Sequence, residues 1–144
     1  MPEKHSITEA IGGLISCLAS HAWAILRFRH YGQGLTLAEL PLLCLGVLAA
    51  ASVSATAFLA PSENAAHHPL MVGALTAGIF AACYTFCGRA GVAGFIILTI
   101  LTEPVSIALR LAGLGDVVDP VFTLWVLASE LVFFFRAAGA ETRA

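Results

Sequence analysis

An apolar stretch, residues 90–114, carries four polar residues at helical intervals: Thr99, Glu103, Ser106 and Arg110. Their spacings of four, three and four residues put them on one face of a helix. A charged side chain at membrane depth costs about 3 kcal/mol on insertion scales, so by default it indicates a functional site. For the carboxyl group of Glu103, the chemistry would be proton exchange or the binding of a cation.

Pro104 directly follows this carboxyl-bearing residue. Proline cannot donate a hydrogen bond to the carbonyl of Ile100, and its ring crowds the preceding turn, so we expect a kink near Glu103. Freed carbonyls beside a carboxylate resemble the broken helices that coordinate cations in transporters. We favour the interpretation as an ordinary kink, because Thr99 or a neighbouring helix can satisfy the freed backbone groups.

Glu130 is a second carboxyl with apolar residues on both sides. From the rise of a helix, Glu103 and Glu130 would lie roughly 9 Å apart along the membrane normal, too far for a direct pair. They could instead be two steps of one hydrated path. If the first helix spans the membrane, His21 lies at the level of Glu130. We then expect His21 or a backbone carbonyl to bond Glu130 and hold two helices in register, with a proton relay as the alternative.

Composition places the chain among helical membrane proteins. Apolar residues make up 59% and charged residues 11% of the 144 residues, against roughly half and a quarter in soluble proteins. The net charge of −2 and the lack of a basic patch argue against a nucleic-acid partner. Enzyme motifs such as G-x-S-x-G, H-E-x-x-H and the P-loop are absent. We therefore predict one membrane domain, residues 1–144, in a lipid bilayer, with no enzymatic activity and no cofactor.

The predicted fold is an all-α membrane protein with a bundle of five transmembrane helices. The hydrophobic runs predict helices over about 7–29, 37–60, 70–87, 90–113 and 120–137. The first helix is ambiguous. Its length of about twenty residues favours a span. The alternative is four spans plus an N-terminal amphipathic helix that lies in the interface, with Trp23 and Arg27 at the headgroups.

Three of the remaining carboxylates have a local explanation at predicted helix starts. The segments Ser6–Glu9 and Thr36–Glu39 match the capping box, in which a hydroxyl and a carboxylate each satisfy a free backbone N–H. Asp119 before Pro120 fits an N-cap followed by proline at the first helical position. These caps would account for Glu9, Glu39 and Asp119. Glu103 and Glu130 therefore remain as the candidate functional carboxyl groups.

Small residues recur on the third and fourth predicted helices. Such rows let helix backbones approach closely in lipid, where packing drives association. We therefore expect the third helix to be central, and we expect a homo-oligomer or a larger membrane complex. The predicted packing residues are Gly73, Ala74, Ala77, Gly78, Ala82, Gly91 and Gly94.

Cys83 and Cys87 are four residues apart and share a helix face. Two such thiols could chelate a soft cation such as Cu(I). The spacing is not C-x-x-C, however, and two ligands make an incomplete site, so we expect no metal.

Arginines set the predicted topology. With five spans, Arg27, Arg29, Arg89, Arg136 and Arg143 fall on one side, and Lys4 and Arg110 on the other. The positive-inside rule then puts the C-terminus in the cytoplasm of, we expect, a bacterial inner membrane. Four spans give the same C-terminal side, and the loop with His67 and His68 lies outside in both arrangements.

We predict a small multi-pass membrane protein that serves as a structural or accessory subunit and assembles with itself or with a larger complex. The alternative is a transporter or channel protomer that conducts protons, a cation or a small solute past Glu103.

Overall fold

The computed structural model describes residues 7–30, 34–35, 38–61 and 68–141. Over these ranges the fold is all-helical. One helix, α3, covers the third and fourth predicted helices, and the other helix ends differ from the predicted ones by at most four residues. The helices are α1 (Ile7–Leu26), α2 (Glu39–Leu59), α3 (Pro69–Leu111) and α4 (Val118–Glu141). Three of them, α2, α3 and α4 as far as Ala137, are long and apolar enough to cross a membrane. This indicates an integral membrane protein.

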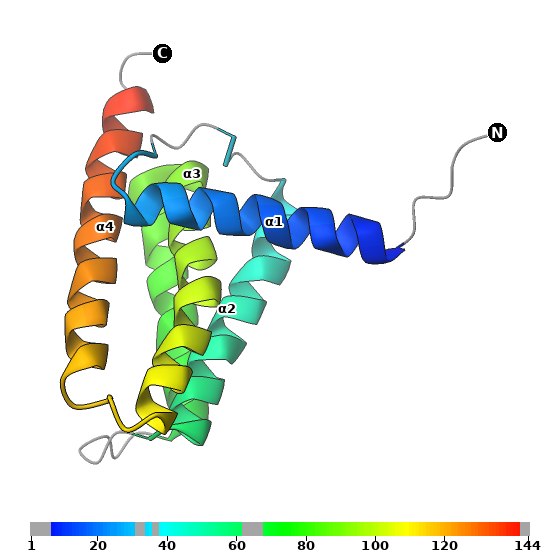
Figure 1. Ribbon diagram of the computed structural model, residues 1–144. Helices are drawn as coiled ribbons and strands as arrows, with labels where there is room; N and C mark the ends of the chain where they lie inside the picture. Colours follow the sequence, from blue (N-terminus) through cyan, green and yellow to red (C-terminus); the bar gives the residue numbers. More distant parts are fainter. Residues whose placement is uncertain (1–6, 31–33, 36–37, 62–67, 142–144) are drawn as a thin grey trace.

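Helix α3 reverses its direction at Gly88. This residue has φ 66° and ψ −175° inside an otherwise helical run, a conformation that glycine adopts without steric cost. Phe80 and Phe95, on either side of Gly88, bring their ring centroids to 5.1 Å, whereas a straight helix would hold them about 22 Å apart. Helix α3 is therefore a hairpin, with a first arm over residues 69–87 and a second arm over 89–111 (Figure 1).

Helix α2, the two arms of α3 and α4 run up and down alternately, and α1 lies across one end of this bundle (Figure 1). The apolar part of α1, Ile11–Leu26, is shorter than the candidate spans. Ala22 and Ile25, near its C-terminal end, are buried against the bundle, while Ile11 and Leu14 are exposed. The five-helix count is thus not confirmed, and α1 lies as in the predicted alternative of an interfacial amphipathic helix.

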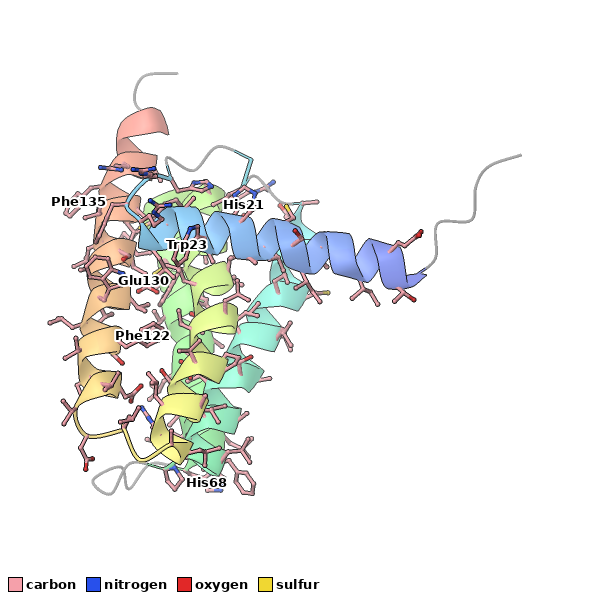
Figure 2. The ribbon with its side chains drawn as sticks, viewed as in Figure 1. His21, Trp23, His68, Phe122, Glu130 and Phe135 are labelled. Carbon is pink, nitrogen blue, oxygen red and sulfur yellow. The ribbon has the colours of Figure 1, made fainter. Side chains whose placement is uncertain are left out.

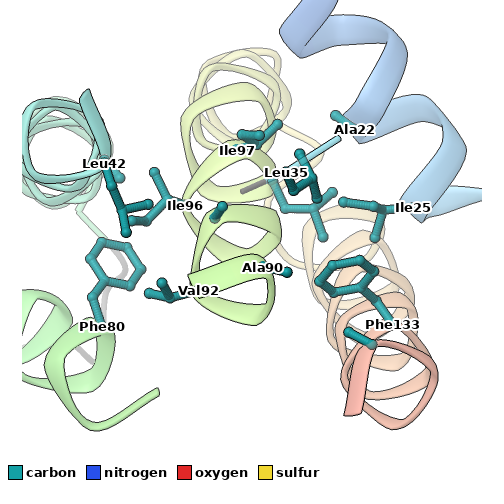
Figure 3. Close-up of a cluster of buried hydrophobic side chains, with 14 residues drawn as sticks. Ala22, Ile25, Leu35, Leu42, Phe80, Ala90, Val92, Ile96, Ile97 and Phe133 are labelled. Atoms are coloured by element: carbon teal, nitrogen blue, oxygen red, sulfur yellow. The ribbon is translucent and has the colours of Figure 1, made fainter. Parts of the chain in front are cut away.

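The second arm of α3 forms the centre of the bundle. Val92, Ala93, Ile96, Ile97 and Leu98 are each at most 2% exposed. Figure 3 shows side chains from both sides converging on this arm, with Leu42 and Phe80 on one side and Ile25 and Phe133 on the other. The prediction that the third helix is central is therefore wrong. That segment is the first arm, and much of its surface is exposed.

The predicted packing residues divide into two groups. Gly73 packs against Ser54 of α2, and Gly91 and Gly94 pack against Phe134 and Phe133 of α4. The other four lie on the exposed surface of the first arm: Ala74, Ala77, Gly78 and Ala82. Close approach within the chain thus uses three of the seven small residues.

Two of the predicted caps are not formed. Helix α2 begins at Glu39 after Ala38, which makes no side-chain cap bond, and the Glu39 carboxylate instead pairs with Arg89 at 2.5 Å. Helix α4 begins at Val118, so Asp119 lies inside the helix and accepts a hydrogen bond from Arg110 Nε at 2.8 Å. In each case an arginine from another part of the chain takes the place of a backbone N–H. Ser6 and Thr36 lie outside the described residues.

Gly94 is tightly packed and Gly78 is not, so replacement by alanine should affect the stability of the fold differently at these two positions. A Cβ at Gly94 would lie 2.6 Å from Phe133 Cζ, so Gly94→Ala should force α4 away from the second arm and destabilise the fold by about 1–3 kcal/mol. Gly78 has no described atom within 4 Å of its Cβ position, so Gly78→Ala should leave stability unchanged or raise it by up to about 1 kcal/mol. Thermal unfolding in detergent measures both. Equal melting temperatures for the two variants would contradict this packing.

Candidate functional site

Glu103 and Glu130 line one cavity, which is partly open to the surface of the bundle at Ile79 and Leu127. The cavity has a volume of about 220 Å³ and lies between both arms of α3 and α4, with Val53 of α2 also at its wall. Glu103 is half-buried, and Glu130 is 6% exposed. Figure 2 shows Glu130 part-way along α4, with Phe122 nearer the start of that helix. The volume holds several water molecules, at about 30 Å³ each.

Five hydroxyl groups line the same cavity: Thr76, Thr99, Thr102, Ser106 and Thr123. Three of them donate to carbonyl oxygens of their own helix, namely Thr76 to Val72 at 3.0 Å, Thr99 to Phe95 at 2.9 Å and Thr102 to Leu98 at 2.8 Å. A hydroxyl that donates to the backbone keeps lone pairs free to accept. The cavity therefore presents acceptor oxygens to whatever enters it.

The rest of the cavity wall is apolar. It consists of Val53, Ile79, Phe95, Phe122, Val126 and Leu127. Polar groups thus gather on the face of the second arm that carries Glu103, because Thr99, Thr102 and Ser106 lie within one or two helical turns of it. Glu130 faces this row from α4. Within the described ranges the structure gives neither carboxyl a hydrogen bond or an ion pair with a side chain.

Sequence reasoning named four of the polar residues at this cavity and missed three. Glu103, Thr99, Ser106 and Glu130 were expected from their depth and spacing. Thr76, Thr102 and Thr123 were not, and Thr76 comes from the other arm of the hairpin. Thr102 offered a signal, since it lies three residues after Thr99 on nearly the same helical face. Thr76 lies at the cavity only because the reversal at Gly88 brings the first arm beside the second.

Pro104 does not break the helix beside Glu103. In α3, Gly88 is the position with non-helical dihedral angles, and the backbone remains helical through Pro104. The proline side chain is exposed, so it faces away from the cavity. The helix is therefore not broken beside Glu103, whereas the kink at Pro104 stays a prediction, because the carbonyl of Ile100 loses its usual N–H donor.

Arg110 belongs to a different cluster at the end of the second arm. Its Nε donates to Asp119 at 2.8 Å, and its Nη1 donates to the carbonyl of Ala60 at 3.1 Å. One guanidinium thus ties the ends of α2 and α3 to the start of α4. Arg110 shares a helical face with Glu103, as its spacing predicted, but it is not part of the cavity lining.

His21 pairs with His30 and not with Glu130. The two rings are joined by a hydrogen bond of 2.7 Å between His21 Nδ1 and His30 Nε2. The ring of His30 also packs against Phe133, at 5.7 Å between centroids. Burial and then the nearby His21 lower the pKa of His30, which favours the neutral ring that this bond requires of at least one partner. The pair holds α1 against the bundle.

Cys83 and Cys87 lie one turn apart in the first arm, both half-buried and both free thiols. Among the described residues, no third histidine, cysteine or carboxylate joins them in a cluster that could hold a metal ion. The pair therefore remains two potential ligands. His67 lies outside the described residues, and His68 accepts a hydrogen bond from the Leu70 N–H at the start of α3.

Comparison with known proteins adds no identity to this geometry. No protein-family model matches the chain, and no curated protein or solved structure matches it.

Proposed function

We propose that the chain passes protons across the membrane through the carboxyl groups of Glu103 and Glu130. The observation that carries this proposal is their shared cavity, in which two carboxyls and five hydroxyls face one space among transmembrane helices. Chains of ionisable side chains at membrane depth are the usual parts of proton relays.

The chemistry of the cavity wall favours a proton over a larger solute. An ionised carboxylate without a partner costs several kcal/mol when it is taken out of water. A carboxyl avoids this cost while it holds a proton, and in that form it can both donate and accept a hydrogen bond. Water in the cavity can accept from one carboxyl and donate to the other, and the threonine oxygens support such water as acceptors.

The depths of the two carboxyls suit a path with two steps. Along the helix axis, Glu103 lies about 10 Å from Arg110, and Glu130 lies about 9 Å from Arg136. These arginines mark opposite ends of the bundle, because the second arm and α4 are antiparallel (Figure 1). In a hydrocarbon core about 30 Å thick, this leaves about a third of the thickness between the two carboxyls, and both of them line the cavity. Each carboxyl would exchange protons with its own end.

The end of the bundle that carries α1 is the cytoplasmic one in this proposal, within a bacterial inner membrane. Four arginines support it: Arg27, Arg29, Arg89 and Arg136. Arg136 donates to the carbonyl of Phe28, just after α1, and Arg89 pairs with Glu39 at the start of α2. The opposite end has Arg110, which is bound to Asp119. An excess of arginine on one side marks the cytoplasmic face.

Proton flux into proteoliposomes tests the proposal. With a potassium gradient and valinomycin as the driving force, and a pH-sensitive dye inside, the unmodified protein should acidify the lumen. Glu103→Gln and Glu130→Gln should each lower the rate by about tenfold or more, since an amide cannot exchange a proton at neutral pH. Asp116→Asn makes the same chemical change at an exposed loop residue and should keep the rate. Flux that survives both glutamine variants would rule the path out.

A structural or accessory role is the second candidate, and one surface favours it. Ala74, Gly78 and Ala82 form an exposed row on the first arm. Such a row lets a helix of a second copy or of a partner approach closely in lipid. This assembly is compatible with proton transfer, because the row lies on the outer surface of the bundle.

The size of the detergent-solubilised particle tests this assembly. Gly78→Leu should shift the protein from an oligomer to a smaller species in light scattering coupled to size-exclusion chromatography, because the side chain separates the packed backbones. Ala128→Leu places the same bulk on an exposed position of α4 and should leave the mass unchanged. If Gly78→Leu also keeps the mass of the unmodified protein, the row is not an interface.

A further inference from the structure

A second and larger cavity lies between α2 and the two arms of α3. Its volume is about 510 Å³, within the range of about 300–1,000 Å³ typical of ligand pockets. Its floor consists of the buried residues Leu42, Phe80, Val92 and Ile96, which turn toward one another in Figure 3. None of its lining residues belongs to the cavity of Glu103 and Glu130.

Small side chains leave this cavity open along the outer surface of the bundle as a groove. Gly46 and Ala50 line it from α2, and Ala77 and Ala81 line it from the first arm. Both alanines of the first arm are exposed, so the groove opens toward lipid. Its apolar walls suit a hydrocarbon chain.

The length of the groove matches one leaflet of a bilayer. On α2 its lining runs from Glu39 to Ala50, which is about 16 Å along the helix axis. The hydrocarbon core is about 30 Å thick, so one leaflet contributes about half of it. The groove thus ends near the middle of the bundle and opens at the end that carries α1.

Polar groups surround the mouth of the groove. Glu39 and Tyr84 belong to its lining, and Arg89 bridges them. Arg89 Nη2 pairs with Glu39 Oε1 at 2.5 Å, and Arg89 Nε donates to Tyr84 Oη at 3.3 Å. The ion pair is accessible, since the side chains of Arg89 and Glu39 are 48% and 75% exposed. A cation and an anion therefore lie side by side at headgroup level.

We infer that this groove binds one phospholipid whose headgroup carries a primary amine, such as phosphatidylethanolamine. An acyl chain fills the groove, the phosphate lies against Arg89 and the Tyr84 hydroxyl, and the ammonium donates to Glu39. The Arg89–Glu39 pair at the mouth carries no net charge, so a zwitterionic head complements it, whereas the glycerol head of phosphatidylglycerol brings no cation to Glu39. A choline head has no N–H to donate to the carboxylate.

Native mass spectrometry of the delipidated full chain tests this inference. The protein is mixed with equal amounts of palmitoyl-oleoyl phosphatidylethanolamine, phosphatidylcholine and phosphatidylglycerol. One phosphatidylethanolamine per chain should bind in preference to each of the other two lipids by about fivefold, the worth of one exposed ion pair. Glu39→Gln should abolish the preference over phosphatidylcholine, because the ammonium then loses its anionic partner.

Two further variants separate the groove from general adhesion of lipid. Ala81→Phe fills the groove from an exposed position and should remove the bound phosphatidylethanolamine. Ala128→Phe adds the same ring to an exposed position of α4, outside the groove, and should retain it. Equal binding of the three lipids, a preference for phosphatidylglycerol, or a bound lipid in Ala81→Phe would each overturn the inference.

Discussion

A left-handed backbone at Gly88 turns the 43 residues of α3 into two antiparallel arms, and most other contacts depend on this reversal. It carries the second arm back through the middle of the bundle, where α1, α2 and α4 all contact α3. Both cavities are lined by residues of both arms, so neither would exist in a straight helix. A side chain other than glycine is strained at this φ, which makes the turn a property of that one position.

The position of Glu130 follows from the packing of α4 on the second arm. Gly91 and Gly94 leave room for the rings of Phe134 and Phe133, so α4 approaches the second arm closely. Glu130 lies one turn before this contact and is held toward the interior, where it lines the cavity with Glu103. The contact of α4 with the second arm thus accounts both for the close packing at Phe133 and Phe134 and for the position of Glu130 in the polar cavity. In the proposed proton path, water in that space would offset the cost of placing a carboxyl inside the bundle.

Local features of the fold could be predicted from the sequence, and long-range ones could not. Hydrophobic runs located the helices, and the elimination of other charges singled out Glu103 and Glu130. The caps assigned to Glu39 and Asp119 were wrong because the arginines that bind them, Arg89 and Arg110, come from distant helices or from across a loop. The partner of His21 could not be found by helical periodicity, because His30 lies in the segment after α1. Periodicity likewise gives no sign of which helix becomes central.

The proposed proton path requires water at the polar row beside Glu103, and cysteine accessibility tests this requirement most directly. With the four native cysteines replaced by alanine, Ser106→Cys would point into the cavity, whereas Val105→Cys would point outward from an exposed position of the same helix. A charged, membrane-impermeant thiosulfonate reagent reacts with a thiol only where water can hydrate it. In proteoliposomes, this account predicts rapid labelling of Ser106→Cys and little labelling of Val105→Cys. Equal, slow labelling of both positions would show a dry cavity and would contradict the account.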